Sequence, residues 1–462
     1  MVLKISWRDG FFSQGFPTDL RNDNNKIDVT DFPRPLQLFS LTYKNLLGKT
    51  DFGYSPAMPL YMQFETGLEM SATMDILTPT DFVDVDAPVQ VIDIDPDSPD
   101  YGTRYPLTIA LTQEADQYRP QNLLQVRPVG KPLRENTTYA LVVKREFAAN
   151  ATSVEPNTVL TALLKGRNPW FVNPLLLPGE ALDARAAYAP LAQFISANNW
   201  QPEDVIGATV WTTGNASRYT RNVVEKTAQW QPAAPDTDWQ LREETADYCV
   251  LESSWQTPVL QKGVIPYFTG GAIEYDEQGT PIVRDTRSTP IIITIPKQDM
   301  PQQGYPGLIA TGAGNFGLGL ALFYSIGETD VGAVIENVYL NVEPGQVVDD
   351  LFHPVWAMAE LALSPANISL QSAKWLQAPE SAPAAPHIMV VEGHYDEQVT
   401  LPMQRPFLIS MGADFVNEEL PLPQESQLLP NIQVAGYQQR WSPVTGNRDG
   451  RTVAFCRIWP QA

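Results

Sequence analysis

The segment that most constrains the fold of this chain is residues 307–325, where an apolar, strand-like stretch passes through a glycine-rich turn into an apolar, helix-like stretch. A strand, a glycine-rich turn and a helix in this order are typical of parallel α/β domains, in which the turn holds a ligand or a nucleophile. The turn has glycines at Gly312, Gly314 and Gly317. It carries no serine where a nucleophile elbow requires one.

Two interpretations of this turn stay open. As a dinucleotide loop it follows a strand and opens a helix, and Glu336 lies about 20 residues further on, where a carboxylate would bind a ribose. Against that interpretation, the chain ahead of the turn is rich in strands and lacks the βαβ repeats of a Rossmann domain. Glycines also let a helix pack closely on a strand. In this second interpretation the glycines serve packing alone, and the turn binds no ligand.

Length and charge exclude some classes of protein. A chain of 462 residues is long enough for two or three domains. It carries 31 basic and 53 acidic residues, a net charge of -22, which repels nucleic-acid phosphates and anionic membranes at long range. We expect no nucleic-acid partner. Because no run of about 18 apolar residues occurs and residues 1–16 lack a signal-peptide pattern, we expect no membrane span and leave the compartment open.

Residues with redox or metal chemistry are few. Cys249 and Cys456 could form one bridge but not a disulfide framework, so their state stays open. The acidic run at residues 93–100 resembles a calcium loop only superficially, since Ser98 stands where glycine is required and Arg104 where glutamate is required. We expect an acidic turn there, and neither a metal nor a cofactor.

The N-terminal half has the pattern of an all-β domain. Short apolar runs occur between proline, aspartate and glycine clusters at residues 89–94, 107–111, 123–129 and 139–143. Several short strands with little helix indicate an antiparallel sandwich. Residues 1–53 are turn-rich and predict an extended segment pinned to a larger body. Residues 166–230 predict a connector, with one or two helices at residues 181–198 and a strand at residues 205–213.

Residues 231–462 predict a second domain that mixes strands and helices. A β-branched apolar run at residues 291–295 is typical of a buried strand. Further strands are expected at residues 248–251, 271–275, 282–283, 308–311, 332–335 and 388–391, and helices at residues 318–326, 355–363 and 403–411. Alternation of this kind predicts an α/β domain. The predicted segments are therefore residues 1–53, 54–165, 166–230 and 231–462.

The best candidate for a catalytic residue is Asp396. The apolar run at residues 388–391 is followed by Gly393 and then Asp396, at the carboxyl edge where an α/β-hydrolase places the acid that orients its histidine. A turn-forming aspartate is the alternative. Ser410 and His394 could form an improvised pair, but Ser410 lies in a helical pattern and is expected to pack.

The other two histidines have simpler interpretations. His353 precedes Pro354 and a helical pattern, so it is expected to cap or orient that helix. His387 follows a proline directly before a strand and is expected to be a loop residue. No Gly-x-Ser-x-Gly sequence occurs in the chain.

Several short motifs occur in an order that resembles one family. They lie at residues 11–12, 16–21, 133–143, 208–213, 266–271, 300–306, 353–354 and 391–396. Together they resemble a group of large bacterial, mostly exported α/β-hydrolases of lipase or esterase type. The resemblance implies an N-terminal Ig-like β-sandwich, an α/β-hydrolase-like domain, ester hydrolysis without a cofactor, and an ester or lipid-like partner. It also implies a location outside the cell or at the cell envelope.

The resemblance breaks at the catalytic residues. Where the family has an oxyanion loop and a Gly-His-Ser-x-Gly elbow, Pro306 leads straight into the glycine-rich turn, and no histidine follows His394. About 160 residues follow Met300, whereas a full α/β-hydrolase domain needs roughly 200 or more. We therefore expect a reduced α/β-hydrolase-like domain that is catalytically incomplete, with only Asp396 matching a triad position.

Three alternatives stay open beside this expectation, so the sequence does not decide whether the chain is an enzyme. The first is an active serine ester hydrolase with a non-standard site. The second is a non-catalytic binding or surface-associated protein. The third is a nucleotide-binding protein that uses the turn from Gly312 to Gly317. The oligomeric state is not indicated.

Overall fold

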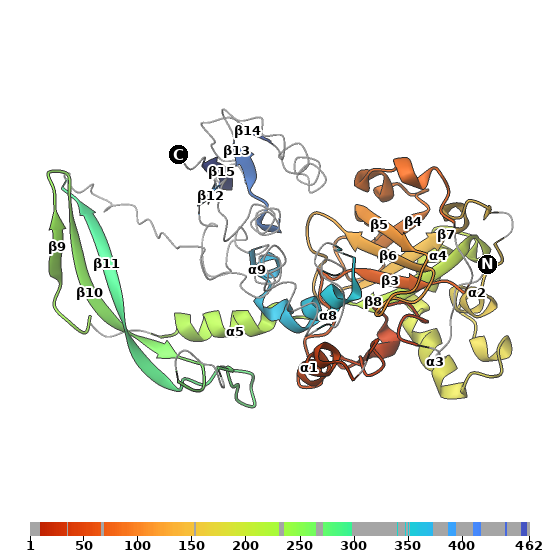
Figure 1. Cartoon of the computed structure of the whole chain (residues 1–462), viewed down its shortest axis with the longest axis horizontal. Helices are drawn as coiled ribbons and strands as arrows, with labels where there is room; N and C mark the ends of the chain where they lie inside the picture. Colours follow the sequence, from red (N-terminus) through yellow and green to blue (C-terminus); the bar gives the residue numbers. More distant parts are fainter. Residues whose placement is uncertain are drawn as a thin grey trace. The chain divides into compact units, whose positions relative to one another are not determined.

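In the computed structural model, the chain forms two compact units (Figure 1). The first unit comprises Met1–Ala216 and Phe316–Ala462, and the second comprises Ser217–Asn315. The structure describes residues 10–34, 36–65, 69–151, 154–230, 235–264, 271–297, 340, 347, 350, 352–372, 387–393, 410–416, 439–440 and 454–459. The four predicted segments are not tested by this division and stay a prediction.

Two antiparallel sheets form the centre of the first unit (Figure 1). One sheet has the order β3-β6-β5 and comprises β3 (Leu60–Gln63), β6 (Leu123–Pro128) and β5 (Leu107–Thr112). The other has the order β4-β7-β8 and comprises β4 (Val89–Asp93), β7 (Thr138–Lys144) and β8 (Val205–Thr212). The strands predicted at residues 89–94, 107–111, 123–129, 139–143 and 205–213 are thereby confirmed.

The sheet β4-β7-β8 is buried on both faces. Gly207 faces the other sheet, because a β-carbon there would meet the Met62 and Phe64 side chains. β8 also contacts the helix α2 (Thr158–Leu164). Residues of β8 are therefore buried along almost the whole strand, rather than in alternation.

The N-terminal segment is pinned to this core by aromatic side chains, as the turn-rich sequence predicts. Phe11 and Phe16 are both buried, and their rings pack with centroids 4.5 Å apart. The Phe16 amide donates to the Tyr61 carbonyl at 2.8 Å, and the Tyr61 amide donates back at 2.7 Å. These bonds attach the segment to β3. The short turn η1 (Asp19–Arg21) and the helix α1 (Leu38–Leu47) follow, so the prediction that residues 1–53 are extended is wrong for residues 38–47.

The predicted connector, residues 166–230, contains two helices before β8, α3 (Pro178–Ala187) and α4 (Ala189–Ala197), and α2 lies just ahead of it. The periodicity at residues 181–198 predicts one or two helices, and the structure shows two. They part at Tyr188 because Pro190 has no amide hydrogen and would clash with a preceding carbonyl in a continuous helix. The Tyr188 hydroxyl donates to the Ala208 carbonyl at 2.9 Å and holds this break against β8.

A distant part of the sequence packs on the same core. The helix α8 (Pro354–Leu363) confirms the prediction at residues 355–363 and is buried from Pro354 to Ala362. It contacts α1 and is followed by η10 (Ser364–Ala366) and α9 (Ile368–Ser372). Just before it, the Phe352 carbonyl accepts a bond of 3.0 Å from the Tyr61 hydroxyl. A helix that is apolar on all sides is expected where neighbours cover it all round.

The C-terminal part of the first unit contains a parallel sheet. Its order is β12-β15-β13-β14, with β12 (Ile388–Gly393), β15 (Ala454–Trp459), β13 (Asp414–Val416) and β14 (Gln439–Arg440). The strand predicted at residues 388–391 is confirmed. Parallel strands need long crossover connections.

The second unit contains α5 (Ser217–Ala228) and the antiparallel sheet β11-β10-β9. The strands are β9 (Gln240–Glu244), β10 (Tyr248–Val259) and β11 (Asp285–Pro296), and β10 includes the strand predicted at residues 248–251. The prediction of a buried strand at residues 291–295 is wrong, because Ile292 and Ile293, which point to opposite faces of β11, are 51% and 36% exposed. β-Branched residues favour a strand whether or not it is buried.

Two other strands expected in this unit are reduced to isolated bridges. Residues 271–275 and 282–283 form no continuous strand. Two isolated β-bridges occur in this region, between Gln261 and Ile273 and between Tyr275 and Pro281. The strands predicted at residues 308–311 and 332–335, the helix at residues 318–326 and most of the helix at residues 403–411 fall outside the part of the chain that the structure describes.

Candidate functional site

The residues that sequence analysis favoured for catalysis or cofactor binding are not described by the structure. Asp396, His394 and the turn from Gly312 to Gly317 all lie outside the described ranges. Ser410 is described and is buried, with 4% of its surface exposed. The proposed roles of Asp396 and of the glycine-rich turn therefore stay predictions.

His353 caps the helix α8, as predicted. Its Nδ1 accepts a hydrogen bond of 3.3 Å from the Val355 amide, so the helix begins on this side chain. The ring is buried and meets the Tyr118 ring edge to face, with centroids 5.4 Å apart. Since Nδ1 is the acceptor in this bond, it is not free to serve as a general base. His387 lies directly before β12, as expected of a loop residue.

The acidic run at residues 93–100 forms turns with its own carboxylates. Asp93 accepts from the Asp95 amide at 3.1 Å and from the Ser98 hydroxyl at 2.6 Å. Asp95 accepts in turn from the Asp97 amide at 3.0 Å. Burial raises the pKa of Asp93. Throughout the described ranges, no group of three or more His, Cys, Asp or Glu residues lies in a position to hold a metal ion.

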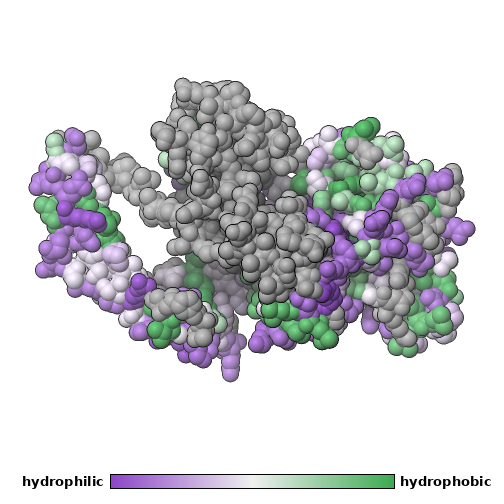
Figure 2. Space-filling view, viewed as in Figure 1, coloured by the Kyte–Doolittle hydropathy of each residue, from purple (hydrophilic) through white to green (hydrophobic). Residues whose placement is uncertain are grey.

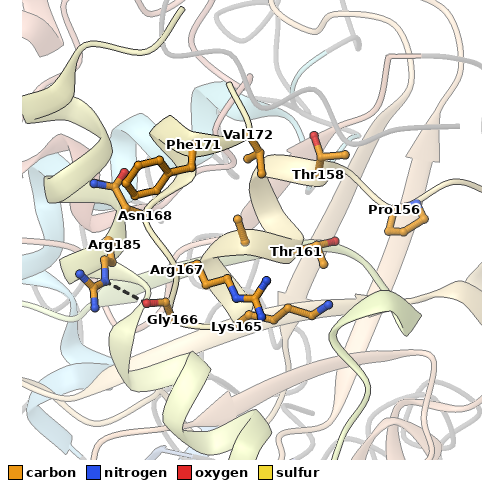
Figure 3. Close-up of a pocket in the computed structure, with 11 residues that line it drawn as sticks. Pro156, Thr158, Thr161, Lys165, Gly166, Arg167, Asn168, Phe171, Val172 and Arg185 are labelled. Atoms are coloured by element: carbon orange, nitrogen blue, oxygen red, sulfur yellow. Dashed lines mark hydrogen bonds between the residues drawn. The ribbon is translucent and has the colours of Figure 1, made fainter. Parts of the chain in front are cut away.

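A pocket of about 690 Å³ lies between the end of α2, the loop after it and α3 (Figure 3). It is lined by Pro156, Thr158, Thr161, Ala162, Lys165, Gly166, Arg167, Asn168, Phe171, Val172 and Arg185. Every charged residue in this lining is basic, although the chain as a whole carries a net charge of -22. The other lining residues are apolar or neutral. A volume of this size is in the range that small-molecule ligands occupy.

Helix α2 brings the first two cations to the pocket. It begins at Asn157, whose side chain accepts from the amides of Val159 and Leu160 at 2.8 and 3.1 Å. Its other end is closed by two bonds of 2.8 Å, from the Gly166 amide to the Leu163 carbonyl and from the Arg167 amide to the Ala162 carbonyl. This pair of bonds is the Schellman motif.

Glycine allows this helix ending, because Gly166 has φ of 66° in the left-handed region. The chain then reverses, and Lys165 and Arg167 lie on either side of the glycine. Lys165 is the C-cap residue of α2 and Arg167 follows two positions later, so both cations come from the end of the helix, where the helix dipole favours positive charge. The local sequence thus accounts for the position of the cations.

The loop after α2 supplies the apolar side of the pocket. Asn168 accepts from the Trp170 amide at 2.9 Å and starts a single turn, η6 (Pro169–Phe171). The rings of Trp170 and Phe171 then meet edge to face, with centroids 5.6 Å apart. Phe171 lines the pocket, yet 78% of its surface is exposed. A large aromatic side chain held at an open pocket can receive the apolar part of a ligand.

The three cations differ in the partners that they already have. Lys165 forms an ion pair with Glu203, and this bond lowers the pKa of Glu203. Arg185 donates its Nε to the Gly166 carbonyl at 2.9 Å, which leaves its two terminal nitrogens for other acceptors (Figure 3). Within the described part of the chain, the Arg167 guanidinium makes no hydrogen bond, but its charge also acts on Glu203 and helps to lower the pKa of that carboxyl group. Guanidinium groups bind carboxylate, sulfate and phosphate groups with paired hydrogen bonds.

Comparisons with protein-family models, curated proteins and solved structures gave no match to this chain. The resemblance to α/β-hydrolases therefore rests on the sequence motifs. Among the described helices, none combines the length and the apolar character needed to cross a membrane.

The pocket was not predicted from the sequence. The local pattern that indicates it is Lys165-Gly166-Arg167 directly after an apolar helix, followed by Pro169 and two aromatic residues. A glycine in that place predicts a helix end, and its basic neighbours are expected to lie together there. The third cation, Arg185, comes from another helix, and no local pattern connects it to the other two.

Proposed function

We propose that this chain is a catalytically incomplete relative of the lipase and esterase-like α/β-hydrolases, with an Ig-like β-domain ahead of the hydrolase-like domain. Its role in this proposal is to bind an anionic, lipid-like small molecule. The observation that supports this role is the pocket beside Phe171, whose charged lining residues are Lys165, Arg167 and Arg185. In an acidic protein, an all-basic lining favours an anionic ligand.

The pocket has a place for each part of such a ligand. An anionic head group would lie between Arg167 and Arg185, which retain nitrogens for paired hydrogen bonds. An alkyl chain would extend over Phe171, Val172 and Pro156, because burying its apolar surface there would stabilise the complex. The ligand class is therefore a medium-chain or long-chain fatty acid, or a similar single-chain amphiphile.

The proposed absence of ester hydrolysis is supported by what the candidate residues do. A triad needs a nucleophile, a base and an orienting acid together. His353 is engaged as a helix cap, Ser410 is buried, and the sequence has no nucleophile elbow. Asp396 alone would orient no base and attack no carbonyl.

Ligand displacement tests the binding function. A fluorescent fatty acid is bound to the full chain below its critical micelle concentration and is displaced with decanoate or with decanol. We expect decanoate to displace the probe far better than decanol, because only decanoate carries a charge for the guanidinium groups. Arg167→Glu is expected to weaken probe binding at least about tenfold, a change of about 1.4 kcal/mol.

Arg287→Glu is the matched control, because Arg287 is an exposed arginine on β11, in the second unit. It should leave binding within about twofold of wild type. Equal displacement by decanoate and decanol, or equal losses in the two variants, would contradict the proposed head-group site.

An ester assay tests the proposed absence of ester hydrolysis. Wild-type protein is incubated with p-nitrophenyl esters of two and ten carbons, beside the variant Asp396→Ala. We expect neither protein to release p-nitrophenol faster than buffer alone does. Turnover that Asp396→Ala abolishes would overturn the proposal and favour an active serine ester hydrolase.

A further inference from the structure

Glu203 lies beside the pocket and is held there by two basic residues. It belongs to the short turn η7 (Pro202–Asp204), which directly precedes β8 and contacts α2. The Arg145 guanidinium donates to the Glu203 carbonyl at 2.8 Å and fixes the backbone of the turn. The Glu203 carboxylate accepts from the ammonium group of Lys165, which lines the pocket. A carboxylate is therefore fixed next to the cations of the proposed binding site.

Glu203 is ionised at neutral pH. The hydrogen bond from Lys165 lowers the pKa of Glu203 below its ordinary value of 4.5, and the charge of Arg167 adds to this effect. Glu203 thus already neutralises one of the three cations in the lining of the pocket. An incoming head group is left with the guanidinium groups of Arg167 and Arg185 as its partners.

The helix that carries Arg185 carries acidic residues as well. Glu180 and Asp183 both lie on α3, and Glu180 accepts from the Leu177 amide at 3.1 Å where the helix begins. Figure 2 shows hydrophilic residues among hydrophobic ones on the surface around α3. Together with Glu203, these two residues equal the three cations of the pocket in number. The surroundings of the pocket therefore have no excess of positive charge that would favour a highly charged ligand.

We propose that Glu203 restricts the pocket to head groups that carry a single negative charge. The proposal rests on the proposed function, because it specifies which class of anion the same pocket binds. The expected ligand is a fatty acid or another monoanionic amphiphile, such as an alkyl sulfate. An alkyl phosphate, which carries a second charge above neutral pH, is the ligand that Glu203 disfavours.

The two kinds of head group differ in what they require of the ion pair. The oxygens of a monoanion accept paired hydrogen bonds from Arg167 and Arg185, while Lys165 stays with Glu203. The second charge of a phosphate would gain most from Lys165, but a displaced Lys165 leaves the Glu203 carboxylate without its partner. Like charges brought close together reduce the affinity. Glu203 therefore opposes binding of the dianion more than binding of the monoanion.

Two ligands of the same shape and different charge test this inference. Decyl sulfate carries one negative charge, whereas decyl phosphate carries nearly two at pH 8, because the second pKa of a phosphate monoester is about 6. Each is used at pH 8, below its critical micelle concentration, to displace the fluorescent fatty acid from the full chain. We expect wild type to bind decyl sulfate at least about fivefold more tightly than decyl phosphate.

Glu203→Gln is the test variant, because glutamine has the same shape and its amide oxygen can still accept from Lys165. We expect this variant to bind decyl phosphate about fivefold more tightly than wild type does, with a smaller change for decyl sulfate. Asp204→Asn is the matched control, since it removes a charge from the same turn while the ion pair of Lys165 is with Glu203. Its ratio of the two affinities should stay within about twofold of wild type.

Lys165→Met provides a second variant with the opposite expected effect. It removes the cation and leaves Glu203 charged beside the ligand. We expect the preference for decyl sulfate over decyl phosphate to rise above that of wild type.

The contrary outcomes separate this inference from the proposed function. Wild type that binds decyl sulfate no more tightly than decyl phosphate overturns the selection by charge alone. An affinity ratio that Glu203→Gln leaves unchanged, or that Asp204→Asn changes equally, also overturns it, as does a lower preference for decyl sulfate in Lys165→Met. Failure of wild type to bind either decyl sulfate or decanoate would reject the proposed function itself.

Discussion

Ser55 donates a hydrogen bond of 2.6 Å to Oε1 of Glu360, a residue 305 positions later in the chain. The Asn367 side chain donates to the same oxygen at 2.8 Å. Glu360 is buried on α8, and Ser55 lies in the loop before β3. The carboxyl group therefore links a late helix of the chain to its N-terminal sheets.

Glu360 should make stability depend on pH. Burial raises the pKa of Glu360 above its ordinary value of 4.5, although the bonds from Ser55 and Asn367 oppose the rise. The folded state thus binds a proton more tightly than the unfolded state does. The stability due to this proton is fully present below pH 4.5 and is lost as the pH rises through the folded pKa.

The variant Glu360→Gln removes this dependence. The amide oxygen of glutamine can accept from both Ser55 and Asn367, so the hydrogen bonds are retained. We expect urea unfolding of the variant and wild type to coincide near pH 4.5 and to diverge in favour of the variant as the pH rises. A stability difference that is constant from pH 4.5 to 8 would contradict the burial of an ionisable carboxyl group.

Arg119 provides a second link between these two regions. It forms ion pairs with Asp116 and with Asp350, whose carboxylate lies just before α8. Burial alone would raise the pKa of Asp116, but bonds from the Tyr118 amide and from Arg119 lower it. A lowered pKa means that this stability is present above about pH 3.8 and is lost as the pH falls through the folded pKa.

Replacing the cation should therefore destabilise the protein at neutral pH. We expect Arg119→Met to lose about 1 to 2 kcal/mol in urea unfolding at pH 7, and less as the pH falls below the pKa of Asp116. The control is Arg134→Met, because the pair of Arg134 with Asp100 is largely exposed and should contribute only a few tenths of a kcal/mol. Equal losses in the two variants would contradict this difference.

Gly214 is required by close packing of the backbone. A β-carbon at Gly214 would collide with the Phe52 carbonyl and with the Gly53 α-carbon, while the Gly214 amide donates to the Tyr54 carbonyl at 2.8 Å. We expect Gly214→Ala to lose about 3 kcal/mol or more, measured by thermal unfolding. Gly179→Ala is the control, because open space surrounds a β-carbon there and alanine favours the helix α3. A loss well below about 3 kcal/mol for Gly214→Ala would contradict this packing, because the loop of Phe52 and Gly53 and the loop of Gly214 would then be able to move apart.

The elements that the sequence predicted well are those with a strong local pattern. The strands at residues 89–94 and 139–143 are apolar runs between turn residues, and the helix at residues 355–363 follows a histidine cap and a proline. The strands with which they pair could not be predicted. β8 follows the helices α2, α3 and α4 in the chain and pairs with β7, which depends on contacts between distant residues.

Two errors of interpretation have physical reasons. The run at residues 291–295 was expected to be buried because it is apolar, yet strand propensity and burial are separate properties, and the structure leaves Ile292 half exposed. The pocket was missed because its cations are distributed over two helices. Lys165 and Arg167 surround a predictable helix end, but Arg185 joins them only through tertiary packing.

The central claim is that one anionic amphiphile binds in the pocket beside Arg167 and Arg185. Calorimetric titration of the full chain with monomeric dodecanoate tests it most directly, with wild type compared to the double variant Arg167→Glu with Arg185→Glu. We predict one molecule bound per chain for wild type and a loss of affinity of at least about a hundredfold, 2.8 kcal/mol, for the double variant. Equal affinity in both proteins, or no heat of binding to wild type, would contradict the claim.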